Sequence, residues 1–366
     1  MIIENVETFL VRIPFDTGST NRNLGGKGWQ TLDYVFVRID TDAGISGWGD
    51  AFGYGAAAAT KAALDHMIAP SLIGRDARDI SGIHDRLQRD NHLFGRYGIT
   101  MFAISGIDIA LWDIAGKAAG MPLHQMLGGQ LRDSLPAYAS LFRYGDPEQV
   151  AAVTKRALDQ GFDSIKLHET GIAEVASCRQ TAGDDVAIML DVNCPWRLDE
   201  ALDMARKLAP FDLYWFEEPV FPPEDFGSLA QLQAQGGLAI AAGENACTAF
   251  EFSRMFEAGA VTYAQPSVTK VGGISEFQKI LAGAEAAGVQ IMPHSPYFGP
   301  GFVATLHLAA AMQDDSLIEY FYLDLEAWPV GQWSQPQDGT FSIPQGPGLG
   351  CDPDADVLKD YSVTAE

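Results

Sequence analysis

Two patterns of apolar and polar residues divide the chain. Near the N-terminus, segments rich in β-branched and aromatic residues predict β-strands, and apolar residues at helical spacing follow them. The strands are expected at residues 2–13, 32–40 and 45–51, and the helices at 56–69, 80–91 and 99–119. Strands followed by helices indicate an α+β capping domain over residues 1–125.

Short apolar strands and helical segments alternate in the next part of the chain. The strands are expected at residues 135–140, 164–168, 187–193, 213–219, 238–245, 262–268, 289–295 and 317–321. Alternation at this spacing predicts an α/β fold, a (β/α)8-type (TIM-like, modified) barrel over residues 126–325. A doubly wound open sheet is the alternative, but no glycine-rich nucleotide-binding motif accompanies it. Residues 326–366, rich in Pro, Gly and Trp, are expected to return to the capping domain.

Composition excludes several kinds of partner. The 24 basic and 48 acidic residues give a formal net charge of −24, which argues against nucleic acid and anionic membranes as partners. No run of about 18 uncharged apolar residues predicts a membrane-spanning helix. Four scattered cysteines and a strand-like N-terminus without a signal pattern favour a cytoplasmic protein with free thiols.

Polar residues end the predicted barrel strands, where active sites of such barrels lie. Asp191, Glu217 and Glu244 end three consecutive strands, so their carboxylates should converge. One such carboxylate commonly caps a helix, but three in matching positions would repel one another unless a cation lay among them. Oxygen ligands suit Mg²⁺, with Mn²⁺ as a second choice. Glu218 must point the other way from Glu217.

Acid and base candidates flank these carboxylates. Lys166 and His168 end the second strand, and His294 ends the seventh. A lysine beside a metal ion and a histidine should have a lowered pKa and could act as a base. The expected chemistry is removal of the α-proton of a metal-bound carboxylate substrate, with Mg²⁺ stabilising the enediolate.

Ordered motifs at these positions resemble the mandelate racemase/muconate lactonizing enzyme branch of the enolase superfamily over essentially the full length. They are Gly47-Trp-Gly49, Glu217-Glu-Pro219, Gly243-Glu-Asn245 and Lys270-Val-Gly-Gly273. The resemblance implies that Glu217 binds the metal and that the active protein is a homo-oligomer. It also implies substrate contacts, for which the candidates are Asn193, Glu319 and Lys270, together with Trp29, Asn23 and Tyr54 from loops of the cap. One of these cap loops, residues 16–29, is expected to be long and mobile.

Two positions depart from the pattern of that branch. His168 stands where the second lysine of a Lys-x-Lys pair acts as a base, so Lys166 could take over that role. Ser267 stands where an aspartate usually pairs with the strand-seven histidine; a serine can orient His294 but cannot raise its pKa. Both departures point away from a two-base racemase.

The resulting hypothesis is an acid-sugar dehydratase or a sugar-acid lactone cycloisomerase, with Lys166, His168 and His294 as catalytic residues. Both reactions begin with α-proton abstraction and continue with β-elimination. Racemisation or epimerisation of a 2-hydroxy or amino acid derivative stays open as an alternative. A Schiff-base aldolase using Lys166 would leave the three acidic strand ends unexplained.

Overall fold

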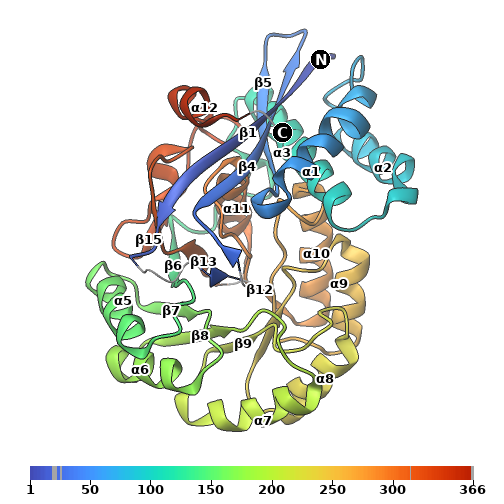
Figure 1. The fold of residues 1–366 in the computed structure, drawn as a ribbon. Helices are drawn as coiled ribbons and strands as arrows, with labels where there is room; N and C mark the ends of the chain where they lie inside the picture. Colours follow the sequence, from blue (N-terminus) through green and yellow to red (C-terminus); the bar gives the residue numbers. More distant parts are fainter. Residues whose placement is uncertain (19–22, 25–26, 314, 364–366) are drawn as a thin grey trace.

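The structure, a computed structural model, describes residues 1–18, 23–24, 27–313 and 315–363 of the chain. An antiparallel sheet forms the first unit, in the order β14 (Asp324–Leu325), β1 (Ile3–Asp16), β4 (Thr31–Thr41) and β5 (Ser46–Ala51). Figure 1 shows this sheet above a barrel that the rest of the chain builds. The predicted cap strands are therefore confirmed.

The motif Gly47-Trp-Gly49 lets a helix lie directly on β5. α3 (Ile99–Ala119) packs so closely that a Cβ on Gly49 would lie 1.9 Å from the Gly106 carbonyl oxygen. The backbone N–H of Trp48 donates to the Asp113 carboxylate at 2.9 Å, which fixes the register of helix and strand. α3 is long and apolar enough to cross a membrane by length and composition, but 78% of its apolar window is buried within this fold. It is the central helix of the cap.

The remaining cap elements surround this helix. They are η1 (Tyr54–Ala56), α1 (Ala57–Ala63), η2 (Leu64–Ile68), η3 (Ala69–Ser71), α2 (Ile80–Asp90) and η4 (His92–Phe94). Within the segment expected to be a long loop, β2 (Asn23–Leu24) and β3 (Lys27–Gly28) pair as a short antiparallel ribbon. The side chain of Asn23 lies outside the described residues, so its predicted substrate contact stays a prediction.

Eight parallel strands form the curled sheet of the second unit. They are β6 (Ser134–Ser140), β7 (Ser164–Leu167), β8 (Ala187–Asp191), β9 (Trp215–Glu217), β10 (Ile240–Ala242), β11 (Tyr263–Ala264), β12 (Gln290–Ile291) and β13 (Ile318–Phe321). β13 pairs with β6 and curls the sheet into the predicted barrel. The strands are shorter than predicted, because the chain leaves the ladder before several of the polar residues expected to end them.

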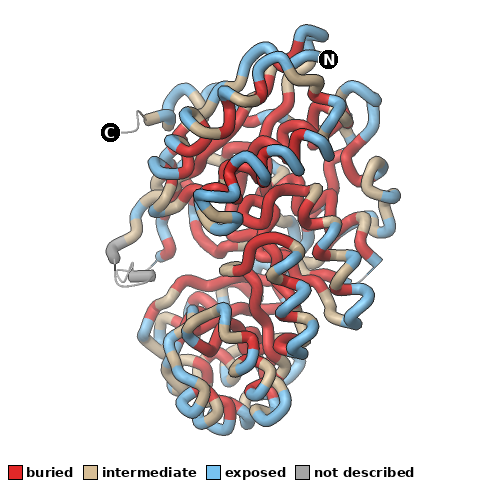
Figure 2. The backbone as a smooth tube through the Cα atoms, turned by 90° about the vertical axis from the view of Figure 1, so that its right-hand side faces the viewer, coloured by how far each residue is buried: buried red, intermediate tan, exposed pale blue. Residues whose placement is uncertain are grey.

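Helices connect the barrel strands. α4 (Leu123–Met126) precedes the barrel, and the connecting helices are α5 (Pro147–Asp159), α6 (Ile172–Ala182), α7 (Leu198–Leu208), α8 (Phe226–Gln235), α9 (Thr248–Glu257), α10 (Ile274–Ala287) and α11 (Pro300–Ala311). A short turn, η5 (Ala209–Phe211), follows α7. Inside the barrel, Tyr138, Met189, Trp215, Ala241 and Met292 form a separate apolar layer. Buried residues run through the centre of both units (Figure 2).

After β13 the chain contacts both units. β14 pairs with β1 of the cap, and β15 (Thr340–Ser342) pairs antiparallel with β6 of the barrel. η6 (Gly331–Ser334) lies between them in sequence, and α12 (Ala355–Tyr361) follows. The Val363 N–H donates to the Leu10 carbonyl at 2.8 Å. The C-terminal segment thus ties the cap to the barrel.

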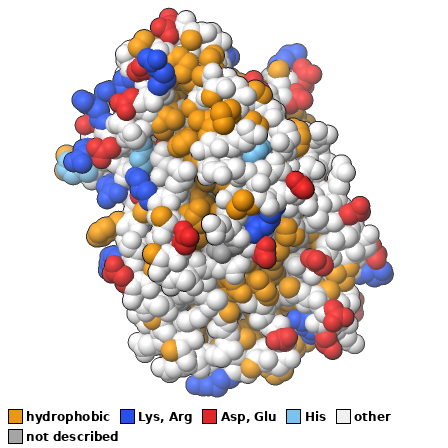
Figure 3. All heavy atoms as spheres, turned by 180° about the vertical axis from the view of Figure 1, so that it is seen from behind, with side chains coloured by type: hydrophobic (Ala, Val, Ile, Leu, Met, Phe, Trp, Pro, Cys, Tyr) orange, Lys and Arg blue, Asp and Glu red, His pale blue; other side chains and the backbone are white. Residues whose placement is uncertain are grey.

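Surface chemistry follows the composition. Figure 3 shows acidic and basic side chains interleaved over one face of the molecule. On α2, for example, Arg86 pairs with Asp90 and Arg89 with Asp85. The four cysteines are free, as predicted.

Candidate active site at the mouth of the barrel

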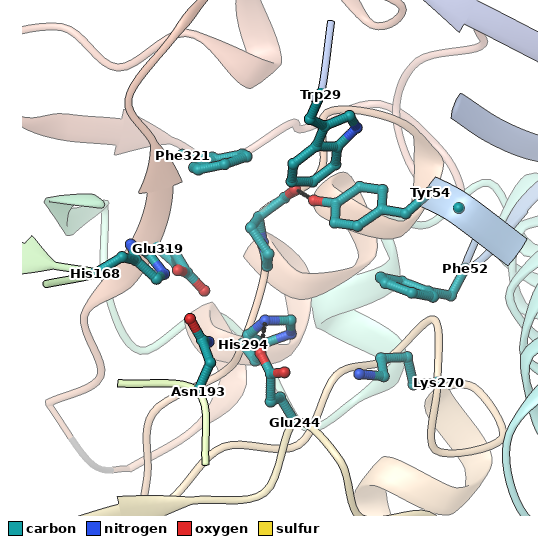
Figure 4. Close-up of a pocket in the computed structure, with 12 residues that line it drawn as sticks. Trp29, Phe52, Tyr54, His168, Asn193, Glu244, Lys270, His294, Glu319 and Phe321 are labelled. Carbon is teal, nitrogen blue, oxygen red and sulfur yellow. Dashed lines mark hydrogen bonds and ion pairs between the residues drawn. The ribbon is translucent and has the colours of Figure 1, made fainter. Parts of the chain in front are cut away.

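A pocket of about 390 Å³ lies between the barrel mouth and the cap. It is lined by Trp29, Phe52, Tyr54, Gly55, His168, Asn193, Glu244, Lys270, His294, Pro296, Glu319 and Phe321. Most of the residues singled out from the sequence are therefore brought together here (Figure 4). Lys166, Asp191 and Glu217 are buried and do not line this pocket.

The predicted carboxylates converge from neighbouring strands. Asp191 and Glu217 end β8 and β9 and are directly paired in the register of the two strands. Glu244 lies two residues beyond the end of β10 and reaches the pocket. Glu217 and Glu218 have different partners, as strand alternation requires. Glu217 accepts from the Trp215 indole at 2.7 Å, whereas Glu218 accepts from the Asn245 amide at 2.8 Å.

Lys166 lies among these acids. Its ammonium contacts Glu319 at 2.8 Å, Glu217 at 3.0 Å and Asp191 at 3.4 Å. Burial lowers the pKa of Lys166, but the charges of Glu217 and Glu319 raise it by more, so the net pKa lies well above its ordinary value. The predicted lowering of the Lys166 pKa assumed a metal ion beside the lysine, and it stays a prediction. Lys166 is a buried cation that neutralises carboxylates.

Lys166 does not balance all of the buried acids. Burial and then the charge of Asp191 raise the pKa of Glu217 well above its ordinary value. Burial and then Glu244 raise the pKa of Glu218 to about 8. Raised carboxyl pKa values indicate a shortage of positive charge at this place.

The donor set fits a hard divalent cation. Asp191, Glu217 and Glu244 supply only oxygen atoms, which Mg²⁺ and Mn²⁺ prefer. Within residues 1–18, 23–24, 27–313 and 315–363, no group of three or more His, Cys, Asp or Glu side chains is arranged to hold an ion as they stand. The reason is visible in their partners: Glu217 bonds Lys166, and Glu244 bonds His294.

His168 reaches the pocket from the end of β7. Its Nδ1 lies 2.6 Å from the Leu141 carbonyl oxygen, and its Nε2 lies 3.3 Å from Asp191. A carbonyl oxygen only accepts, so Nδ1 carries a proton, and Nε2 is the ring nitrogen that faces Asp191. The position two residues beyond Lys166 therefore brings its side chain to the pocket, while Lys166 lies deeper.

His294 faces the same pocket from the loop after β12. Its Nε2 lies 2.6 Å from Glu244, and its Nδ1 is buried without a hydrogen-bond partner. The expectation that Ser267 orients this imidazole is wrong. Ser267 contacts the Tyr297 hydroxyl at 3.1 Å, and that hydroxyl donates to the His294 carbonyl at 3.1 Å. The serine therefore supports the backbone of His294, because the tyrosine stands between them.

Arg143 was not identified as a site residue from the sequence, although it closely follows the first barrel strand. Its Nη2 donates to the Asn193 Oδ1 at 3.1 Å, and its Nε donates to the His168 carbonyl. Asn193 takes a left-handed backbone (φ 53°), and its N–H donates to Asp191 at 2.9 Å. Arg143 thus joins the ends of β7 and β8 on one side of the pocket.

The loop carrying Lys270 is held by the cap. The Gly272 N–H donates to Ser105 at 2.9 Å, and its carbonyl accepts from the His84 Nε2 at 3.0 Å. A Cβ on Gly273 would lie 2.4 Å from Asp108 Oδ2, which explains the two glycines of this motif. The Lys270 ammonium lies 4.8 Å from the centre of the Phe52 ring. Cap and barrel therefore build the site together.

The chain matches two family models. Residues 19–128 match the N-terminal domain of mandelate racemase and muconate lactonizing enzyme. Residues 149–357 match the enolase C-terminal domain-like family. This chain belongs to the enolase superfamily, in its mandelate racemase/muconate lactonizing enzyme branch. The resemblance seen in the motifs is thus confirmed.

Relatives within this superfamily are enzymes of sugar acids. The chain is 33% identical to 3,6-anhydro-alpha-L-galactonate cycloisomerase of Streptomyces coelicolor, over 95% of this chain and 96% of the relative. It is 35% identical to D-galactonate dehydratase of Ralstonia nicotianae, over 91% and 92%. A solved racemase from Streptomyces coelicolor with bound magnesium superposes with a TM-score of 0.88, at 30% identity, over 99% of this chain and 100% of that one.

Proposed function

We propose that this superfamily member removes the α-proton of a sugar-acid carboxylate and then eliminates the oxygen substituent on the β-carbon. One observation carries the proposal: two imidazoles, His168 and His294, line one pocket above a cluster of buried carboxylates. The names of the relatives support the same reaction class, as a dehydratase or a cycloisomerase. A proton taken by one imidazole and a proton given by the other would complete the reaction.

We propose Asp191, Glu217 and Glu244 as the ligands of Mg²⁺, or of Mn²⁺. A bound divalent ion would stabilise the negative charge that develops on the substrate carboxylate when the α-proton leaves. Side chains of the protein itself transfer protons and hold the substrate. His168 and His294 exchange protons with the substrate at Nε2. Asn193 and Lys270 contact the substrate, and the cap excludes water from the pocket.

The surroundings of Lys166 favour this reaction over a Schiff-base aldolase. A nucleophilic lysine must be neutral and must reach the substrate. Lys166 contacts three carboxylates that raise its pKa, and it does not line the pocket. We propose instead that it holds Glu217 and Glu319 in place. Failure of borohydride to trap a substrate on the wild-type protein is the expected result.

NMR in D₂O with Mg²⁺ and a panel of aldonic and aldaric acids and their lactones or anhydro forms tests the proposal. The expected result is loss of the α-proton together with the β-oxygen, giving a 2-keto-3-deoxy acid, and loss of turnover in EDTA. α-Deuteration with the β-oxygen retained would instead support the racemase alternative. The proposal is wrong if metal-loaded protein neither exchanges an α-proton nor eliminates on any member of the panel.

Two variants assign the acid and the base. We expect His168→Asn and His294→Asn each to lower kcat by about 100-fold or more, because each removes a proton-transfer group. The variant lacking the base should also lose α-proton exchange, whereas the variant lacking the acid should keep it. His66→Asn, on η2 away from the pocket, is the matched control. Near-wild-type turnover in either pocket variant contradicts the role given to that histidine.

A further inference from the structure

Half of the large apolar side chains that the described part of the chain exposes are gathered at one place. Of ten such side chains, four belong to the turn between α2 and α3: Leu93, Phe94, Tyr97 and Ile99. Leu93 and Phe94 are 82% and 65% exposed, and Phe250 of α9 is 69% exposed. Single exposed apolar residues are ordinary, but a group of them indicates contact with another surface.

The turn that carries these residues meets the start of α9. The Tyr97 hydroxyl donates to the Asn245 carbonyl at 2.7 Å, and Asn245 lies three residues before α9. Burial and then neighbouring acidic groups, among them Glu251 of α9, raise the pKa of Tyr97 to about 12. Figure 1 shows α2 and α9 along the same side of the molecule. Leu93, Phe94, Tyr97 and Phe250 are here named the apolar face.

Hydrogen bonds hold the turn from both sides. Arg96 donates to the Gln88 Oε1 from Nε at 2.9 Å and from Nη2 at 2.7 Å, which joins the turn to α2. Tyr97 joins it to the barrel. Gly95 and Gly98 have φ values of 94° and 61°, which let the chain reverse twice within a few residues. The apolar face therefore loses little backbone freedom when a partner covers it, and this favours binding.

Opposite charges flank the apolar face. On the cap side, the hydrogen bonds of the Arg96 guanidinium within the described residues go to a neutral amide oxygen. On the barrel side, Glu224 lies close enough to Glu251 that its charge, after burial, raises the pKa of Glu251. A two-fold rotation about the face exchanges the two sides. It places Arg96 of each copy against Glu224 and Glu251 of the other.

We propose that two copies of this chain pair through the apolar face as a two-fold symmetric dimer. Its three aromatic side chains expose roughly 350 Å² per copy, close to half of the about 800 Å² that each partner buries in a standard interface. The net charge of −24 makes most encounters between copies repulsive, whereas Arg96 supplies a local cation at this face. The inference concerns assembly and does not depend on the proposed reaction.

Sedimentation equilibrium of the full chain tests the pairing. We expect the wild-type protein to be a dimer or an assembly of dimers. Phe94→Glu and Phe250→Glu should each raise the dissociation constant by about 100-fold or more, because each variant places two carboxylates in an apolar contact. Leu131→Glu is the matched control: Leu131 is 58% exposed between α4 and β6, and its variant should assemble as wild type does.

Three results overturn the inference. A wild-type protein that is monomeric at about 100 μM does so, and it leaves the apolar face to a different protein. Unchanged assembly in both Phe94→Glu and Phe250→Glu places the interface elsewhere. Equal dissociation in Leu131→Glu shows that any added carboxylate dissolves the assembly.

A charge reversal tests the two-fold arrangement. Arg96→Glu and Glu224→Arg should each weaken the dimer by about 10-fold at low salt, because like charges then face each other at two places. The double variant should bind within about threefold of wild type, because the pair is restored with its signs exchanged. A double variant weaker than either single variant contradicts the pairing of Arg96 with these acids.

Discussion

Replacement of Lys166 by methionine tests whether this buried cation holds the acidic cluster together. Its ammonium lies 2.8–3.4 Å from three carboxylates, and its side chain is 1% exposed. Two opposite charges about 3 Å apart interact by roughly 5 kcal/mol at an effective dielectric constant near 20. Desolvation offsets part of this, and loss of one partner from a buried pair costs about 3–5 kcal/mol. We expect that loss of unfolding free energy in the metal-free Lys166→Met protein.

The pH dependence of this loss has a definite sign. Without the ammonium, the folded-state pKa values of Glu217 and Glu319 should rise. The folded protein then binds more protons than the unfolded chain, so its stability falls as pH rises. The deficit relative to wild type should therefore be larger at pH 8 than at pH 5.5.

Urea denaturation in EDTA, followed by tryptophan fluorescence, measures the effect. Lys155→Met is the matched control: Lys155 and Asp159 are 68% and 63% exposed, and such surface pairs contribute about 0.5 kcal/mol or less. Mg²⁺ should restore more stability to Lys166→Met than to wild type, because an ion among these acids replaces the missing charge. A metal-free Lys166→Met protein as stable as wild type would refute the reasoning.

Two further predictions concern stability away from the pocket. Burial lowers the pKa of His307 to about 4, so the unfolded chain binds the extra proton first. The unfolding free energy of the wild-type protein should therefore fall by roughly 3 kcal/mol as the pH is lowered from 6.5 to 4. In urea titrations His307→Asn should lose this dependence and His66→Asn should keep it; an unchanged slope contradicts the assignment. Gly273→Ala places a Cβ 2.4 Å from Asp108 and should lower stability by about 1–3 kcal/mol more than Gly183→Ala, which has a similar backbone (φ 78°, ψ −179° against φ 85°, ψ −163°) but open space. Thermal unfolding compares the two, and equal losses would exclude the clash.

The sequence alone determined the architecture and the place of the site. Apolar runs separated by helical periodicity specify parallel strands, and parallel strands bring their carboxyl ends to one face. Asp191 and Glu217 could therefore be predicted as neighbours, and the strand register confirms it. The glycines beside Trp48 could also be recognised as a motif, because close packing of a helix on a strand leaves no room for a side chain.

Only the tertiary structure determined how deeply each site residue is buried and which residues it contacts. Lys166 lies in β7 and His168 lies one residue beyond its end, and both contact Asp191, but only His168 lines the pocket. Tyr297 intervenes between Ser267 and His294, which no spacing in the sequence reveals. The aromatic part of the pocket combines Trp29, Phe52 and Tyr54 of the cap with Phe321 of the last barrel strand. Local sequence patterns specify on which face of a strand a side chain lies. Contacts between distant segments depend instead on how the cap packs on the barrel.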